Sequence, residues 1–88
     1  MAQQNSFVQQ YTVTASAVAL ADHQVINSVT ISAKSTNTGI AYLGFSSGVT
    51  SANGYPLEKG TSVTLRIANT NQIYVAGTAS DVVSTIGS

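Results

Sequence analysis

Residues 7–20 read FVQQYTVTASAVAL, and the pattern of this stretch decides the class of fold. Apolar and polar side chains alternate along it. The apolar positions are Phe7, Tyr11, Val13, Ala15 and Ala17, and the polar positions between them are Gln10, Thr12, Thr14 and Ser16. Successive side chains of a strand point to opposite faces, so a period of two residues indicates a strand with one buried face. For the alanine-rich part, residues 15–21, we expect strand or a bend in preference to a helix.

The same period returns further along the chain. It is carried by Val25, Val29, Ile31 and Ala33, by Val63, Leu65 and Ile67, and by Ile73 and Val75. Residues 40–45 and 81–86 are rich in β-branched and aromatic side chains, which also favours strands. The sequence therefore predicts an all-β fold, either a small antiparallel β-sandwich or a jelly-roll-like barrel, with about six to eight short strands. Residues 1–88 form a single domain in this prediction, and residues 1–6 form a flexible N-terminal arm.

The composition excludes several classes of function. Only 7% of the 88 residues are charged and the net charge is zero, so phosphate backbones and anionic lipids are not attracted, and we expect neither nucleic-acid nor membrane binding. The chain has no cysteine and one histidine, so we expect no metal site and no cofactor. Low charge also removes the repulsion that keeps copies apart, which favours a homo-oligomer. The first ten residues carry no basic or apolar region of the signal-peptide kind, so we expect synthesis in the cytoplasm without a leader.

Residues 50–65, TSANGYPLEKGTSVTL, contain the single proline and two of the six charged residues. Asn53-Gly54 favours positive backbone φ angles, and Tyr55 before Pro56 favours an extended conformation. We expect a loop with an extended middle and a second turn at residues 58–60. One interpretation is a loop whose proline and charges prevent edge-to-edge aggregation. The other is an apolar tip, formed by Tyr55, Pro56 and Leu57, that inserts into a partner.

Residues 39–87 read GIAYLGFSSGVTSANGYPLEKGTSVTLRIANTNQIYVAGTASDVVSTIG. They resemble a pattern of small virion proteins from tailed bacteriophages: YLG, then VT..NG.PL..G, then a strand, then IYV.GTA.D.VS.I. The resemblance covers about residues 25–87. The matching positions are Tyr42, Leu43, Gly44, Val49, Thr50, Asn53, Gly54, Pro56, Leu57, Gly60, Ile73, Tyr74, Val75, Gly77, Thr78, Ala79, Asp81, Val83 and Ile86. Where the pattern has a glycine after Ala79, this chain has Ser80, so a turn that requires positive φ is less secure at that place.

The resemblance implies a β-sandwich subunit of a phage particle. The first expectation is a head decoration, or cement, protein that sits on the capsid exterior as a homotrimer, binds the major capsid protein and has no enzymatic activity. The alternative is a module of a head fibre or tail that contacts host glycans. The residues expected to contact a partner are Tyr55, Pro56, Leu57 and Tyr74.

The chain offers little for catalysis. His23 has no cysteine to activate, no serine lies in a G-x-S-x-G elbow, and the acids Asp22, Glu58 and Asp81 are far apart in sequence. We expect Asp22-His23 to form a polar turn, with a weak metal or proton-linked contact as the alternative. Asp81 is expected to accept backbone N–H groups in the turn before the last strand, with a shared cation on an oligomer axis as the alternative.

The remaining polar and aromatic candidates have simple interpretations. Arg66 is expected to be solvated, with a capsid or phosphate contact as the alternative. The four tyrosines, Tyr11, Tyr42, Tyr55 and Tyr74, raise a carbohydrate-binding alternative because aromatic faces stack on sugars. Tyr11 fits the apolar face of its strand, whereas Tyr74 points away from Ile73 and Val75, as an interface residue does.

Overall fold

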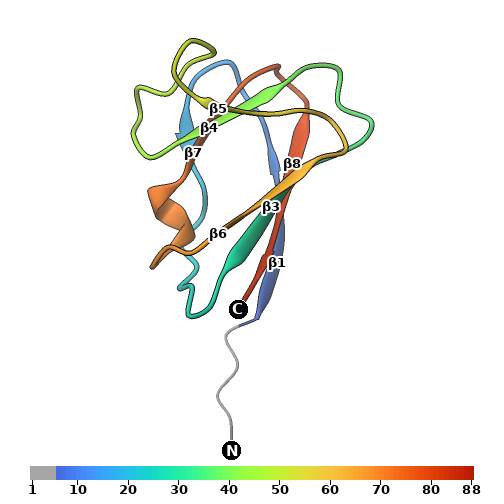
Figure 1. Cartoon of the computed structure of the whole chain (residues 1–88). Coiled ribbons are helices and arrows are strands. Elements are labelled where there is room, and N and C mark those ends of the chain that lie inside the picture. The colour runs from blue at the N-terminus through green and yellow to red at the C-terminus, as the bar shows by residue number, and fades with distance from the viewer. Residues whose placement is uncertain (1–5) are drawn as a thin grey trace, which may run out of the picture.

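Two layers of short strands make up the molecule (Figure 1). The structure is a computed structural model that describes residues 6–88. Residues 1–5, most of the predicted N-terminal arm, lie outside the described residues. The strands are β1 (Phe7–Thr12), β2 (Val18–Ala19), β3 (Val29–Ala33), β4 (Ala41–Gly44), β5 (Tyr55–Leu57), β6 (Ser62–Leu65), β7 (Tyr74–Ala76) and β8 (Val82–Gly87), with a 3₁₀ turn, η1 (Thr70–Gln72), before β7.

Each layer is a four-stranded sheet in which all neighbours are antiparallel. The first sheet has the order β1-β8-β3-β6 and the second has the order β2-β7-β4-β5. The predicted all-β sandwich is confirmed, and its strands number eight within residues 6–88. Apart from the β4–β5 step, successive strands belong to different sheets, so the chain repeatedly crosses between the layers.

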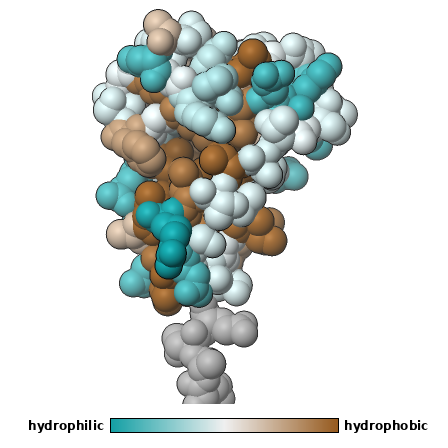
Figure 2. Space-filling model, viewed as in Figure 1, coloured by the Kyte–Doolittle hydropathy of each residue, from teal (hydrophilic) through white to brown (hydrophobic). Residues whose placement is uncertain are grey.

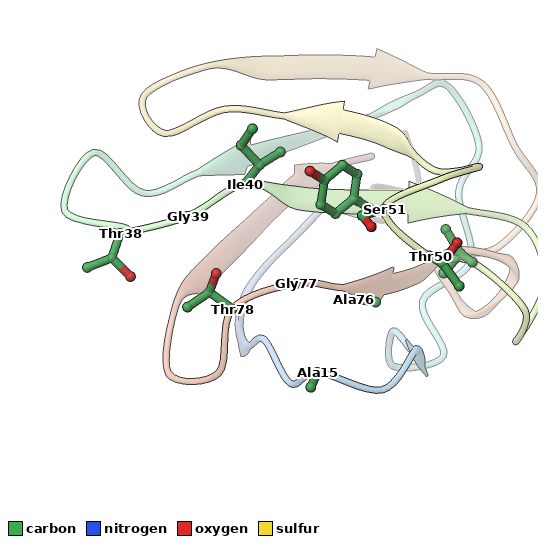
Figure 3. A pocket seen from close by; sticks show the side chains of 11 residues that line it. Ala15, Thr38, Gly39, Ile40, Thr50, Ser51, Ala76, Gly77 and Thr78 are labelled. Carbon is green, nitrogen blue, oxygen red and sulfur yellow. The ribbon is translucent and has the colours of Figure 1, made fainter.

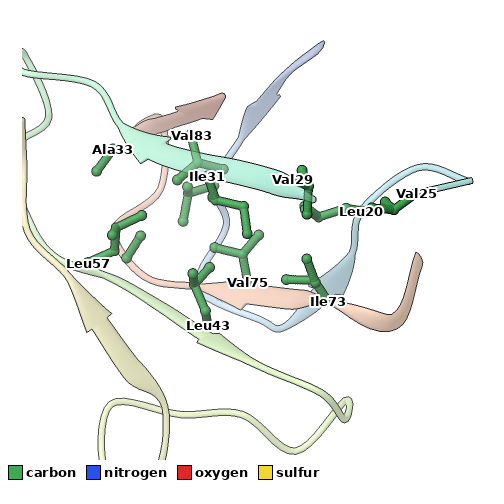
Figure 4. Close-up of a cluster of buried hydrophobic side chains, with 12 residues drawn as sticks. Leu20, Val25, Val29, Ile31, Ala33, Leu43, Leu57, Ile73, Val75 and Val83 are labelled. Atoms are coloured by element: carbon green, nitrogen blue, oxygen red, sulfur yellow. The ribbon is translucent and has the colours of Figure 1, made fainter. Parts of the chain in front are cut away.

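The core lies between the two sheets (Figure 4). Along β3 the predicted alternation holds: Val29, Ile31 and Ala33 are buried, and Thr30 and Ser32 face outward. The facing layer is supplied by other apolar side chains, among them Leu43, Leu57, Ile73 and Val75. Each strand therefore turns one apolar face inward, as the two-residue period requires.

Residues 7–20 do not form one continuous strand. β1 ends at Thr12, Ala15 is exposed, and the chain joins the second sheet only at β2. The physical reason is a corner at Val13, whose N–H donates to the carbonyl of Asp81 at 2.7 Å and whose carbonyl accepts from the N–H of Ser80 at 3.1 Å. A strand that changes sheets bends at such a corner. Ala15 and Ala17 alternate with polar residues but belong to no strand, so the predicted strand is wrong at these two positions.

The segment predicted as a loop around Pro56 contains the short edge strand β5. Its register places Tyr55 opposite Leu43, Pro56 opposite Tyr42 and Leu57 opposite Ala41. A proline is compatible with an edge strand because one side of that strand pairs with no neighbour, so the missing N–H group of proline breaks no hydrogen bond there.

The expectation of positive φ at Asn53-Gly54 is wrong. In residues 6–88 the positive φ angles lie at Gly60 and Ser80, both 76°. Gly54 is required for a different reason: a Cβ atom there would lie 2.7 Å from both the Cβ of Tyr42 and a methyl carbon of Val49. The asparagine-glycine pair therefore allows close packing, not a left-handed turn.

The 3₁₀ turn η1 was not predicted as a helical turn. Asn69 caps it, because its side chain accepts from the N–H of Asn71, and the Gln72 side chain accepts from the N–H of Asn69. This reciprocal capping box is visible in the sequence as Asn-x-x-Gln. Three residues are too few for a helical period to show in the sequence.

Candidate interaction surface

An apolar groove runs along the side of the sandwich where β5 and β6 form the sheet edges. It is lined by Leu43, Phe45, Tyr55, Val63 and Leu65 and has a volume of about 190 Å³. Apolar atoms gather along the middle of the face on which β6 lies (Figure 2). Phe45 is 65% exposed and Tyr55 is 56% exposed, whereas Leu43 in the groove is buried. Two exposed aromatic side chains and three aliphatic ones therefore line the groove, and no charged side chain does.

The strand register explains how the sequence builds this groove. Tyr55 lies opposite Leu43, and directly opposed residues of an antiparallel pair point to the same face. Tyr55 therefore points toward the inside of the sandwich, but at its open end. Val63 and Leu65 point inward from β6 and are only half-buried, because no further strand lies beyond this edge. A sandwich closed at this side would cover all of them.

The four predicted contact residues do not share one surface. Tyr55 lines the groove and Pro56, its neighbour on β5, is exposed. Leu57 is only 2% exposed and belongs to the core, so the prediction that it forms an exposed tip with Tyr55 and Pro56 is wrong. Leu57 alternates with Pro56 and lies deeper between the sheets than Tyr55. Tyr74 is half-buried on β7, in the sheet whose edge is β5, and it does not line the groove.

Sequence reasoning missed Phe45, Val63 and Leu65 as site residues. Each was interpreted as part of a strand, and a half-buried apolar residue looks the same in the sequence as a core residue. The signal that distinguishes them is position at a sheet edge, which depends on strand order. Phe45 could have been found from the sequence, because it directly follows β4 and precedes the turn residues Ser46-Ser47-Gly48. A large exposed ring is unusual at such a place.

The opposite side of the sandwich is closed by the segment that contains Asp22 and His23. The His23 ring stacks on Phe7, with 4.7 Å between ring centroids, and its Nε2 lies 2.6 Å from Oε1 of Gln9. The Tyr11 hydroxyl accepts from the N–H of Ala21. The predicted polar turn thus covers the inward side chains of β1, and the His23 ring and the Gln9 amide are already paired within the chain.

Asp81 holds a second corner of the fold. Its Oδ1 accepts from the N–H and the hydroxyl of Thr38 at 3.0 and 3.2 Å, and its Oδ2 accepts from the N–H of Gly39 at 2.9 Å. The prediction that Asp81 accepts backbone N–H groups is confirmed, but the donors lie in the loop between β3 and β4 and not in its own turn.

These bonds also set the charge state of Asp81. The hydrogen bond from the Thr38 backbone is the main reason why the pKa of Asp81 lies below its ordinary value of 3.8. Burial of the carboxyl raises the pKa and so works against this effect, while the Gly39 N–H and the Thr38 hydroxyl lower it further. The carboxylate therefore stays ionised at neutral pH and ties two loops together.

A shallow hollow of about 590 Å³ lies beside Tyr42 (Figure 3). Its lining includes the hydroxyl side chains of Thr38, Thr50, Ser51 and Thr78 and no charged side chain. Figure 3 shows these side chains coming from separate loops around the hollow. Its chemistry is that of a neutral, hydroxyl-rich surface with one aromatic ring.

Several positions that match the phage pattern have structural roles here. Val49 is buried and fits into a space that Gly44 and Gly54 leave open, since a Cβ atom at either glycine would lie under 3 Å from Val49. Asn53 Oδ1 accepts from the N–H of Thr50 at 2.7 Å and holds the same loop. These matches fix the loop between β4 and β5 on the sheet and do not mark a contact surface.

Other candidate chemistry is sparse in the part of the chain that the structure describes. No three histidine, aspartate or glutamate side chains among residues 6–88 come together as metal ligands. Arg66 is exposed. In the same residues, no helix has the length and apolar character that crossing a bilayer requires. No protein-family model, curated protein or solved structure matches the chain. The function is therefore inferred from the geometry above together with the sequence resemblance.

Proposed function

We propose that the protein is a non-enzymatic structural protein of a bacteriophage virion, a head decoration protein that binds the outside of the capsid and stabilises it. The observation that carries the proposal is the apolar groove at the β5–β6 edge. Exposed aromatic rings beside a desolvated aliphatic pocket are typical of the centre of a protein–protein interface. The sequence resemblance supplies the kind of particle.

The size and charge of the groove favour a protein side chain as its occupant. Small-molecule sites commonly enclose about 300–1,000 Å³, and the groove, at about 190 Å³, is smaller than that. It has room for one or two apolar side chains of a partner. The chain carries three basic and three acidic residues, so association depends on shape and apolar burial and not on electrostatic attraction.

The partner in this proposal is the major capsid protein. An apolar side chain on the capsid surface enters between Phe45 and Tyr55 and covers Val63 and Leu65. Binding to the folded state stabilises it by mass action, so a small domain without disulfides gains stability when it is seated on the shell. Pro56 lies at the rim of this contact, whereas Leu57 acts only through the core.

The test uses capsid shells from which the protein has been removed, to which purified variants are added back. Phe45→Ser removes one aromatic wall of the groove, and Ile26→Ser is the matched control because Ile26 is also exposed, at 58%, and does not line the groove. We expect Phe45→Ser to weaken binding at least about tenfold, as loss of an interface hot spot does, while Ile26→Ser binds as the unmodified protein does. Failure of the unmodified protein to bind shells, or equal binding by Phe45→Ser, contradicts the proposal.

The hollow beside Tyr42 favours a second candidate function, a head-fibre or tail module that binds neutral host glycans. An aromatic ring among hydroxyl groups offers stacking and hydrogen bonds without charge. The test is an NMR titration with the methyl glycosides of glucose, galactose and N-acetylglucosamine, comparing Tyr42→Leu with Tyr42→Phe. Saturable shifts at Thr50 and Thr78 that Tyr42→Phe keeps and Tyr42→Leu loses would support this candidate. Absence of shifts with all three sugars would remove it.

A further inference from the structure

Strand β1 is an edge of the first sheet, and its outer side pairs with no other strand of residues 6–88. Its six residues, FVQQYT, pair with β8 from Phe7 opposite Gly87 to Thr12 opposite Val82, and the order of the sheet leaves the other side of β1 without a neighbouring strand. β1 contains no charged residue and no proline. An uncharged edge of this length is a template on which another strand can pair.

The other three sheet edges of the described residues are protected by known devices. β2 has two residues, and β5 has three with Pro56 at its centre. β6 has four residues and is followed directly by the exposed cation Arg66. Short length, proline and charge each discourage pairing with a further strand. The contrast singles out β1, the longest edge of the four.

The inward side chains of β1 are already held in place. Phe7 stacks on His23, Gln9 is hydrogen-bonded to His23, and the Tyr11 hydroxyl accepts from the N–H of Ala21. The edge is therefore ordered before anything binds to it, which lowers the entropy cost of association. An incoming strand needs only to supply backbone groups and side chains that match the two faces.

We propose that this edge pairs with β1 of a second copy of the chain, antiparallel about a two-fold axis, to form one continuous eight-stranded sheet. The alternation of faces limits the register, because opposed residues must belong to the same face. An axis at Gln9 satisfies this requirement and places Phe7 opposite Tyr11 of the second copy. Gln9 then lies opposite its own counterpart, and Val8 lies opposite Gln10.

This register matches side chains by kind. On the inner face it forms two aromatic pairs and one amide pair, which are favourable cross-strand combinations. On the outer face Val8 and Ile86 are neighbours, 69% and 58% exposed, and the axis places the two Val8 side chains diagonally across the seam, within reach of each other. The same edge thus offers both the backbone pairing and the apolar contact of a dimer. This pairing belongs to the free chain and does not depend on the proposed capsid role.

The test is sedimentation velocity of the full-length chain over a concentration series, with two lysine substitutions. Val8→Lys places a positive charge on the β1 edge, near the same charge of the second copy. Val18→Lys is the control, because it makes the same change at Val18 of β2, which is 51% exposed. We expect the unmodified chain and Val18→Lys to sediment at twice the single-chain mass of 9.0 kDa. Val8→Lys, folded by circular dichroism, should raise the dimer dissociation constant at least about tenfold.

Hydrogen exchange locates the contact independently of mass. Amides of β1 should exchange more slowly in the dimer than in Val8→Lys, while amides of β5 and β6 should not differ. A monomer at all concentrations, or the homotrimer that the phage resemblance implies, overturns the two-fold pairing. So does a Val8→Lys chain that stays dimeric, a Val18→Lys chain that becomes monomeric, or β1 exchange that does not change. Binding of the chain to capsid shells is a separate result that none of these outcomes decides.

Discussion

Ser80 and Gly60 hold the same backbone torsion with different side chains. φ is 76° at both, in the left-handed region that disfavours residues with a Cβ atom. Ser80→Gly therefore removes the backbone strain of a left-handed residue with a Cβ atom, and Gly60→Ser introduces the same strain. Neither change removes a backbone hydrogen bond, because the Ser80 N–H still donates to Val13 and the Gly60 N–H still donates to Ala33.

The magnitude follows from two opposing terms. The left-handed conformation costs a residue with a Cβ atom roughly 1–2 kcal/mol, whereas glycine loses about 0.5–1 kcal/mol more backbone entropy on folding than alanine does. The midpoints of these two ranges differ by about 0.75 kcal/mol, so Ser80→Gly should raise the free energy of unfolding by about 0.5–1 kcal/mol. In a domain of this size that corresponds to a rise in Tm of about 2–8 °C. Gly60→Ser should lower Tm by a similar amount, since a Cβ atom at Gly60 has no atom within 4 Å and meets no steric obstacle.

Thermal unfolding by circular dichroism measures both changes, at one protein concentration because association also shifts Tm. Ala79→Gly is the control: Ala79 is the exposed neighbour of Ser80 and lacks a positive φ, so glycine should lower stability there by about 0.5–1 kcal/mol. A Ser80→Gly protein no more stable than the unmodified chain would refute the reasoning. A Gly60→Ser protein of unchanged Tm would do the same.

Three further predictions concern the core, the loop over Gly54 and the acid range. Leu57→Ala should lower the free energy of unfolding in urea by about 2–5 kcal/mol, because Leu57 is a core residue. Pro56→Ala, on the exposed side of β5, should lower it by under about 1 kcal/mol. Equal losses would contradict the assignment of Leu57 to the core. Gly54→Ala should lower stability by about 1–3 kcal/mol through overpacking, since its Cβ atom would lie 2.7 Å from neighbouring side-chain carbons, and an unchanged urea midpoint would argue against that contact. The pKa of Asp81 is lowered, so its carboxylate stabilises the fold at pH values above the ordinary pKa of 3.8, and this contribution is lost as the pH falls through the lowered pKa. Asp81→Asn should therefore lose less stability than the unmodified chain between about pH 5 and pH 2, whereas Glu58→Gln, at an exposed acid, should follow the unmodified chain. Identical acid curves for all three proteins would contradict the role of Asp81.

The fold class was predictable because the decisive signal is local. The alternation of Val29, Ile31 and Ala33 with polar residues needs no partner to be recognised, and the structure confirms it at β3. The corner at Val13 was not predictable in the same way. Its bonds to Ser80 and Asp81 join residues almost seventy positions apart, and the alternation before and after it has the same period.

The candidate site was predictable only in part. Tyr55 was singled out correctly as an exposed aromatic residue, but Leu57, two residues away on the same face, is in the core. Depth between the sheets separates them, and depth depends on how β5 pairs with β4. Val63 and Leu65 became site residues because β6 is an edge strand, which follows from strand order and not from any property of the two side chains.

The proposed capsid role is tested most directly by quantitative mass spectrometry and electron cryomicroscopy of phage virions purified from lysates in which the chain is produced. We predict many copies per particle, on the order of the number of capsid subunits or local threefold sites, with density on the outer shell and the β5–β6 groove toward the capsid. Absence of the chain from purified virions, or a copy number of only a few at the neck or tail, would contradict the account.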